Sequence, residues 1–260
     1  MRLARALDAK KVRRERRLLV AEGEDLVEAA LDHGLTPQAV LVDAARAEEI
    51  GPLLDRMADL PERYAVPSDL MGHVAVLAST PRVIAIVPQP GPYGFNEVRW
   101  PPRMGVWLAG VADPGNVGTL VRSAAALGAD WVALGPGSAD PYHPRALRAA
   151  MGATFALPLL ESVRAEDLAT RTGFQVVAAA VVDGKSPWDV DLTRPTVLAL
   201  GAERAGIDPA LDALSRGGVE VSVTTIPQDR RTESLNVSAA GAVLMGEALR
   251  QREVQGRGLV

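Results

Sequence analysis

"IPQDRRTESLNVSAAGAVLMGEALR", residues 226–250, joins a polar loop to a stretch of small and apolar residues. From Val237 onward these residues recur at intervals of three and four, the spacing of a helix that buries one face. They are Val237, Ala240, Gly241, Leu244 and Ala248. The polar run Ser234, Leu235, Asn236 stands directly before them. We therefore expect a polar cluster held at the beginning of a packed helix.

The chain before this helix alternates between apolar strand patterns and helical patterns. We expect strands within residues 104–112, 131–135, 174–182 and 196–201, and helices within 115–128 and 143–152. Apolar strands that alternate with helices are typical of a mostly parallel sheet covered on both faces. The sequence therefore predicts an α/β domain over residues 104–260.

Residues 88–103 contain five prolines, which disrupt both helix interiors and central strands. This stretch is predicted to connect two domains, with a boundary near residue 95. Before it, a basic segment leads into a helical stripe through Leu26, Ala29, Ala30 and the apolar residues preceding them, which Gly34 ends. "AVLVD" at 39–43 predicts a strand, and "RVIAIV" at 82–87 a further extended segment. The sequence therefore predicts a small α/β module over residues 1–95.

Composition limits the chemistry. The 260 residues are 48% hydrophobic and hold no cysteine and three scattered histidines, so a disulfide is excluded and a metal site is not expected. No apolar run approaches the roughly 20 residues of a membrane span, and no signal-peptide core is visible. We expect a cytoplasmic protein that binds no membrane.

The net charge is −4, yet the first twenty residues hold eight Arg or Lys and two acidic residues. Such an arm is suited to an anionic partner. A solvated helix face explains the same charges equally well.

Three turns that follow predicted strands carry polar residues. The first holds Asp113 and Asn116, the latter well suited to cap the following helix, with Arg122 beside its buried stripe. The second holds Glu203 between two glycines, and the third is the run that ends at Asn236. Taken singly, each turn is explained by helix capping, and Arg122 by pairing with a surface acid. The chain lacks the three-glycine dinucleotide fingerprint, which argues against a nucleotide-dependent oxidoreductase.

Taken together, "NVGTLVRSAAALG", "LALGAERAG" and "IPQDRRTESLNVSAAGAVL" resemble the three ordered motifs of the SPOUT-class RNA methyltransferases, in the SpoU or TrmH branch that methylates ribose 2′-hydroxyls. "DPYHPRALRAAMGATFALPLL" is similar to the segment after the first motif. "KKVRRERRLLVAEGEDLVEAAL" resembles the start of a substrate-binding domain akin to RNA-binding ribosomal proteins. The resemblance covers nearly the entire chain. It implies a deep trefoil knot, S-adenosyl-L-methionine as cofactor, and a homodimer that builds each active site.

The resemblance also assigns roles to residues. Arg122 would work with an RNA phosphate, by charge stabilisation and orientation. Residues that would complete the catalytic group are Asn116, Glu203, Ser234 and Asn236. Residues that would line the adenosine pocket are Gly201, Ile226 and Leu235, with their neighbours Leu200 and Pro227. Expected RNA phosphate contacts are Arg13, Arg14, Arg145 and Arg148. Ala202 departs from the polar residue that relatives often carry there.

Several readings stay open. Large-subunit ribosomal RNA is the first expected substrate, with housekeeping and antibiotic-resistance roles both open, and transfer RNA is the second. A non-catalytic RNA-binding or ribosome-assembly protein is the other alternative, although Asn116, Arg122, Glu203 and Asn236 are all intact. His143 is expected to be a turn residue rather than a catalytic base.

Overall fold

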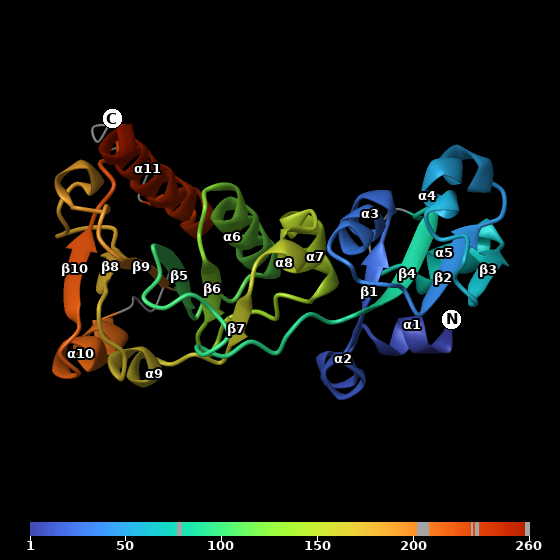
Figure 1. Ribbon diagram of the computed structural model, residues 1–260, viewed down its shortest axis with the longest axis horizontal. Coiled ribbons are helices and arrows are strands. Elements are labelled where there is room, and N and C mark those ends of the chain that lie inside the picture. The colour runs from blue at the N-terminus through green and yellow to red at the C-terminus, as the bar shows by residue number, and fades with distance from the viewer. Residues whose placement is uncertain (77–79, 202–207, 230, 232–233, 258–260) are drawn as a thin grey trace. The chain divides into compact units, whose positions relative to one another are not determined.

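The computed structural model describes residues 1–76, 80–201, 208–229, 231 and 234–257 (Figure 1). Contacts within the chain divide it into two units. Unit 1 comprises Met1–Gly91 and Asp140–Ala156, and unit 2 comprises Pro92–Ala139 and Leu157–Val260. The segment Asp140–Ala156 thus groups with the N-terminal residues, although in sequence order it interrupts the C-terminal ones.

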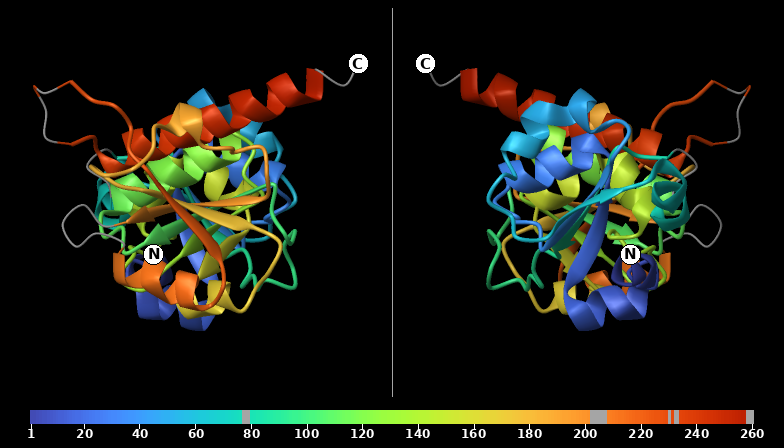
Figure 2. Two further views of the ribbon diagram at one scale, coloured as in Figure 1. Left: turned by 90° about the vertical axis from the view of Figure 1, so that its left-hand side faces the viewer. Right: turned by 90° about the vertical axis from the view of Figure 1, so that its right-hand side faces the viewer.

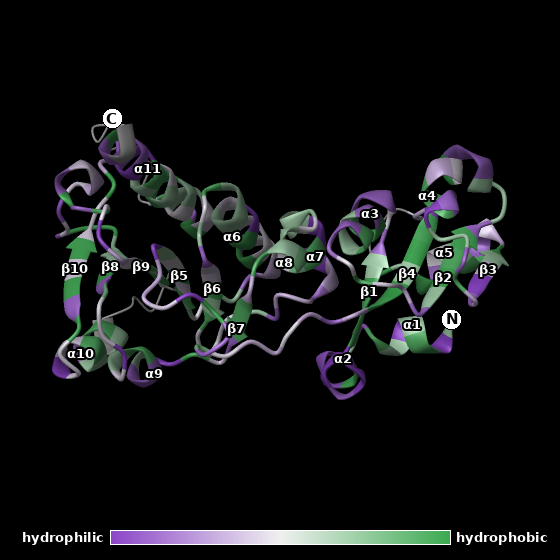
Figure 3. Ribbon diagram, in the orientation of Figure 1, coloured by the Kyte–Doolittle hydropathy of each residue, from purple (hydrophilic) through white to green (hydrophobic). Residues whose placement is uncertain are grey.

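The described residues of unit 1 form a sheet in the order β1-β4-β2-β3, in which β4 is antiparallel to β1 and β2. The strands are β1 (Leu18–Glu22), β2 (Ala39–Asp43), β3 (Arg63–Val66) and β4 (Val83–Pro88). The helices are α1 (Arg2–Ala6), α2 (Lys10–Arg16), α3 (Glu24–Asp32), α4 (Gly51–Asp55), α5 (Ser68–Val74), α7 (Pro144–Ala150) and α8 (Ala153–Ala156), with the 3₁₀ helix η1 (Ala47–Ile50). Residues of α1 and α5 form a core with those of β1, β2 and β4. Figure 3 shows α2 as hydrophilic and β4 as hydrophobic.

One predicted element of unit 1 was wrong. The apolar residues before Leu26 were expected to continue the helical stripe, but they form β1, whose five residues are all buried. A short continuous apolar run does not distinguish a doubly covered strand from a buried helix. Gly23, at φ 90°, ends the strand and precedes the first residue of α3.

Unit 2 contains the predicted parallel sheet, in the order β10-β8-β9-β5-β6-β7 with every pairing parallel. Its strands are β5 (Met104–Ala109), β6 (Trp131–Leu134), β7 (Leu159–Glu161), β8 (Gln175–Ala179), β9 (Thr196–Gly201) and β10 (Glu220–Thr224). Its helices are α6 (Pro114–Ala126), α9 (Ala165–Ala169), α10 (Asp208–Arg216) and α11 (Val237–Arg257), with the 3₁₀ helix η2 (Pro187–Asp189). The sequence patterns missed β7, which is only three residues long, and β10, an edge strand with exposed and half-buried residues.

Helices cover both faces of this sheet. Figures 1 and 2 show α6 and α11 on one face, and α9 and α10 on the other. Under α9 and α10 lies a core that contains Trp107, Trp131, Leu168 and Leu214. The indole Nε1–H of Trp107 donates to the carbonyl oxygen of Val163 at 3.0 Å, so this buried ring also has its polar atom satisfied.

The proline-rich segment after Gly91 packs against unit 2. The rings of Phe95 and Trp100 meet edge to face at 5.3 Å, and Trp100 stacks on Trp131 at 5.9 Å. The guanidinium of Arg171 lies 4.8 Å from the centre of the Phe95 ring. These aromatic contacts hold residues 95–100 against the sheet domain, beyond what a simple connection requires.

Within the described part of the chain, no helix has both the length and the apolar character needed to cross a membrane. The same residues contain no group of three His, Asp or Glu side chains suited to holding a metal ion.

Candidate active site

The two central strands of unit 2 end side by side. Leu108 of β5 pairs with Leu200 of β9, and Ala109 pairs with Gly201. Because the strands are parallel, the segments that leave them emerge at the same edge of the sheet. In open α/β sheets this carboxyl edge is where ligands bind.

The segment after β5 turns directly into α6. Asp113, not Asn116 as predicted, is the residue that caps this helix, since its Oδ1 accepts the backbone N–H of Asn116 at 2.9 Å. Pro114 occupies the first helical position, where its missing N–H costs nothing. Asn116 therefore lies in the first turn, with its side chain available for other contacts.

Asn116 uses that side chain to meet the third motif. The Nδ2 of Asn236 donates to the Oδ1 of Asn116 at 3.0 Å, across 120 positions of sequence. Ser238, which the sequence reasoning did not select, joins the same group: its Oγ lies 2.5 Å from Oδ1 of Asn236 and 3.3 Å from Oδ1 of Asn116. The beginnings of α6 and α11 are therefore joined by a polar cluster of three side chains.

Close packing of the two helices brings these side chains together. Helix α11 contacts both α6 and β9. A methyl group added at Gly241 would clash with Leu120 of α6 and would come within 2.8 Å of Leu200 of β9. Glycine at this position therefore permits the close approach of α11. Of the stripe predicted for α11, Ala240 is half-buried and the other four residues are buried.

Two other predicted catalytic residues lie on, or just before, the helices that carry this cluster. Arg122 is exposed on α6, and within the described residues its guanidinium has no hydrogen bond or ion pair. Ser234 is exposed just before α11. Glu203 lies outside the described residues, as does Ala202.

The predicted adenosine-lining residues differ in exposure. Gly201 and Ile226 are half-buried, Pro227 is exposed, and Leu235 is 37% exposed. The side chain of Leu200 is buried beneath α11 and packs in the core. Its predicted part in the cofactor pocket could therefore involve only its backbone.

Gly184 and Lys185 bond to Thr225 just after β10, and these bonds fix the start of the loop that carries Ile226. The N–H of Gly184 donates to Oγ1 of Thr225 at 2.9 Å, and the N–H of Thr225 donates to the oxygen of Lys185 at 2.9 Å. A side chain at Gly184 would come within 2.5 Å of the backbone of Thr224. Gly184, a lone glycine after β8, is the sequence feature that indicates this close contact.

Further along the same loop, Arg231 donates to Asp229, with Nε and Oδ1 2.9 Å apart. This hydrogen bond lowers the pKa of the Asp229 carboxyl from its ordinary value. Both side chains are exposed, so the pair shapes the loop more than it stabilises the fold.

Arg13 is not positioned to meet RNA. Its side chain is 3% exposed, and its Nη2 lies 2.6 Å from Oδ2 of Asp140. Its Nη1 donates to the carbonyl oxygens of Leu7 at 2.7 Å and Asp8 at 2.5 Å. These internal bonds argue against the predicted phosphate contact and assign Arg13 to the core of unit 1.

The other predicted RNA-contacting arginines are exposed. They are Arg14, Arg145 and Arg148. Arg148 lies on α7. His143 caps the start of this helix, because its Nδ1 accepts the backbone N–H of Arg145 at 3.2 Å. His143 is thus a helix-capping residue, as its position in a turn suggested.

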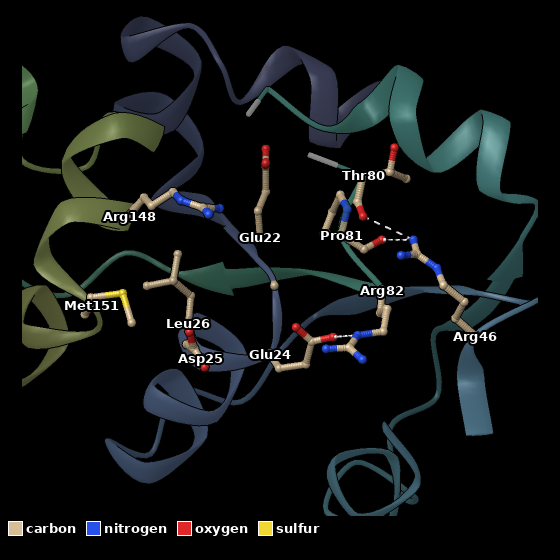
Figure 4. A pocket seen from close by; sticks show the side chains of 11 residues that line it. Glu22, Glu24, Asp25, Leu26, Arg46, Thr80, Pro81, Arg82, Arg148 and Met151 are labelled. Carbon is tan, nitrogen blue, oxygen red and sulfur yellow. Dashed lines mark hydrogen bonds and ion pairs between the residues drawn. The ribbon is translucent and has the colours of Figure 1, made fainter. Parts of the chain in front are cut away.

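Arg148 also lines a cavity of about 430 Å³ in unit 1 (Figure 4). Two other arginines of its lining are already engaged: Arg82 binds Glu24 at 2.5 Å and Glu49 at 2.8 Å, and Arg46 donates to the oxygen of Thr80 at 3.1 Å. Arg148 has no such partner among the described residues. The three carboxylates of the lining, from Glu22, Glu24 and Asp25, equal its three arginines in number, so Arg148 is the arginine whose charge is left for an outside partner.

Comparison with known proteins gives two family matches. Residues 103–246 match the model of the SpoU rRNA Methylase family, and residues 1–85 match that of the MRM3-like substrate binding domain. An uncharacterised tRNA/rRNA methyltransferase of Synechocystis sp. is 31% identical over 95% of this chain and 89% of its own length. The 23S rRNA (guanosine(2553)-2′-O)-methyltransferase RlmP of Bacillus subtilis is 29% identical over 92% of this chain and 91% of its own. The crystal structure of the SpoU methyltransferase AviRb from Streptomyces viridochromogenes, in complex with AdoMet, superposes with a TM-score of 0.82 at 26% identity, over 97% of each chain.

Proposed function

Because this chain belongs to the SpoU rRNA methylase family, we propose that it methylates a ribose 2′-hydroxyl of RNA with S-adenosyl-L-methionine as the methyl donor. The observation that carries the proposal is the bond between Asn116 and Asn236, which joins the first and third motifs at the carboxyl edge of the sheet. A similar protein over nearly the whole chain was crystallised with the same donor.

Ribosomal RNA of the large subunit is the proposed substrate. RlmP is named for 23S rRNA, as is a 28% identical relative from Streptomyces viridochromogenes. The Synechocystis relative is named for tRNA or rRNA, which keeps transfer RNA as the second candidate.

Partly exposed apolar side chains fit the adenosine of the donor. Ile226 follows β10 and Leu235 precedes α11, so both lie on segments that carry the family motifs. Leu235 leaves 37% of its surface uncovered, which suits contact with a flat heterocycle. Gly201, at the end of β9, lets backbone approach a ligand closely.

When bound, the donor supplies a methyl group on a positively charged sulfur. With the donor held by Gly201, Ile226 and Leu235, transfer would join the ribose oxygen to the methyl carbon, leave the electron pair of the broken carbon–sulfur bond on sulfur, and release the hydroxyl proton to an acceptor. Aligning oxygen, carbon and sulfur supplies much of such a rate enhancement. The guanidinium of Arg122 offers hydrogen-bond donors and no acceptor, so its part is to hold an RNA phosphate and stabilise charge that develops on oxygen.

Asn116, Ser234 and Asn236 would orient the substrate beside Arg122, together with Glu203. We further propose a deep trefoil knot in the last part of the sheet domain, as the family motifs imply. A homodimer is proposed on the exposed side of α11, where Val243 is 41% and Val254 60% exposed.

RNA recognition is proposed for residues 1–95, whose first 85 match a substrate-binding family, with the methyltransferase domain at 104–260. Arg14, Arg145 and Arg148 are the proposed phosphate contacts, and Arg13 is withdrawn because it is buried. Such contacts position an RNA without reading its sequence.

The test is to incubate the protein with labelled donor and ribosomal RNA, and to map resistance to alkaline hydrolysis at single-nucleotide resolution. Arg122→Ala should abolish label transfer and leave donor binding nearly unchanged. The matched control is Arg216→Ala, an exposed arginine on α10 at the opposite face of the sheet, which should transfer label normally. Full transfer by Arg122→Ala would contradict the role of Arg122, and label on a base rather than a ribose would contradict the reaction.

A further inference from the structure

The cluster of Asn116, Asn236 and Ser238 has a defined hydrogen-bond direction. The backbone N–H of Ser238 lies 2.8 Å from the side-chain oxygen of Asn236. A backbone N–H only donates, so the amide atom of Asn236 that faces it has to be the oxygen. The amino group of Asn236 then faces Asn116 at 3.0 Å, and the atom of Asn116 that receives it has to be the oxygen.

The backbone N–H of Ser238 fixes the direction of both amides, because it can only donate. Asn236 stands immediately before α11, and its acceptance of the N–H of Ser238 is an N-cap bond. The N-cap bond at the start of α11 thereby sets the direction of the Asn116 amide on α6.

The Ser238 hydroxyl reinforces this direction. Ser238 is 9% exposed, and its Oγ lies 2.5 Å from the oxygen of Asn236 and 3.3 Å from that of Asn116. Both neighbours are acceptors, so the single hydroxyl proton has to point at one of them, and the shorter distance favours Asn236. If either amide turned over, the hydroxyl would lose an acceptor.

We propose that Ser238 is a positioning residue that fixes the Asn236–Asn116 pair in one direction, so that Asn116 presents its amino group to an oxygen of the RNA substrate. Within the described residues the Nδ2 of Asn116 has no hydrogen-bond partner. The acceptor it fits is a ribose or phosphate oxygen that carries negative charge, because an N–H donor stabilises such charge and a carbonyl oxygen repels it. This inference rests on the proposed function.

The decisive variant is Asn236→Asp. Its carboxylate still accepts both donors of Ser238, but it has no donor to offer Asn116. Asn116 then turns its amino group inward and presents its oxygen to the substrate. We expect kcat to fall by about 10²–10³, the usual cost of losing one donor at a reacting oxygen, with the Kd for S-adenosylmethionine unchanged.

Asn116→Ala removes the same donor and should lose a similar factor. Because Asn236→Asp has already withdrawn that donor, adding Asn116→Ala to it should cost little more. Such non-additivity is the expected sign of two residues acting as one unit. Losses that multiply would overturn the proposal, as would wild-type kcat in Asn236→Asp.

Ser238 itself is tested by a conservative series. Ser238→Ala keeps the backbone N–H, so we expect only about a 3- to 10-fold loss in kcat, the value of one neutral hydrogen bond, with an unchanged KM for the methyl donor. Ser238→Thr keeps the hydroxyl and should recover most of the loss. The control Ser123→Ala removes a half-buried serine of α6 that is outside the cluster and should leave kcat unchanged. Equal losses in the alanine and threonine variants would refute a role for the hydroxyl.

One readout is independent of catalysis. In NMR spectra of the free protein, the one amino proton of Asn236 that is bonded to Asn116 should exchange with water more slowly than either amino proton of Asn116. The reverse pattern would overturn the inference even if no RNA substrate were known. Absence of RNA methylation by the wild-type protein would instead refute the proposed function and leave this pattern to decide the direction of the pair.

Discussion

Replacing Gly241 by alanine tests whether close packing of α11 holds the candidate site together. The added methyl group would clash with Leu120 and would come within 2.8 Å of Leu200, both of which are fully buried. Overpacking of this kind costs about 1–3 kcal/mol. Alanine also favours a helix over glycine by about 1 kcal/mol, so the net destabilisation should be about 0–2 kcal/mol.

Gly246 provides the matched control, because it lies in the same helix and a methyl group added there would meet nothing within 4 Å. Gly246→Ala should gain the helix propensity alone and stabilise unit 2 by about 1 kcal/mol. The difference between the two variants therefore isolates the steric cost of about 1–3 kcal/mol. For a domain of this size it corresponds to about 2–12 °C in Tm.

The assay is thermal unfolding of both variants, followed by label transfer to RNA below both melting temperatures. We expect Gly241→Ala to melt lower than Gly246→Ala and to have a reduced kcat, because a displaced α11 separates Asn236 from Asn116. Equal melting temperatures would refute the close approach of the helices. A lower Tm with unchanged kcat would refute the link between this packing and the site.

Three further outcomes are expected. Arg13→Met leaves Asp140 without its buried partner and should destabilise unit 1 by about 3–5 kcal/mol, measured by denaturant unfolding; intact stability with weakened RNA binding would restore the phosphate contact. Arg148→Ala should weaken binding of all RNA sequences alike and reduce the salt dependence of log K by about one counterion, and an unchanged slope in filter binding would exclude the contact. The hydroxyl of Ser68 is the chief cause that lowers the pKa of Asp43, so the ionised Asp43 should stabilise the folded protein above its ordinary pKa of 3.8 and lose this effect as pH falls below it. Asp43→Asn should therefore flatten the acid end of the profile of unfolding free energy against pH. An unaltered profile would exclude that role.

The sequence predicted the elements whose pattern is local. Of the stripe expected on α6, Val117, Leu120, Val121 and Ala124 are buried, whereas Leu127, the C-cap residue, is half-buried. The apolar strands β5, β6, β8 and β9 lie in one parallel sheet, as expected. Strand β1 was mistaken for part of a helix because a five-residue apolar run has no periodicity that separates the two. Strand β10 was missed because an edge strand does not need apolar residues on both faces.

The sequence predicts which residues form the candidate site, but it does not predict the hydrogen bonds between them. Family motifs selected Asn116 and Asn236, but they carry no statement that the two amides bond directly or in which direction. Sequence preference predicts Asn116 as the cap because asparagine is favoured there, whereas Asp113 three positions earlier caps the helix. The basic N-terminal arm predicts Arg13 as a phosphate contact, and no local pattern reveals its partner 127 positions away.

The direction of the Asn236–Asn116 pair depends on the packing of α11 against α6. Asn236 can serve as acceptor for Ser238 and as donor to Asn116 only while α11 begins beside α6, and that approach requires glycine at position 241. A change in the helix contact and a change in amide direction should therefore both remove the same donor from the substrate. On that reasoning, Gly241→Ala should lower kcat strongly in the wild-type background and weakly in an Asn116→Ala background. Equal factors in both backgrounds would mean that the packing of α11 acts on catalysis by another route, such as the loop that carries Ser234 and Leu235.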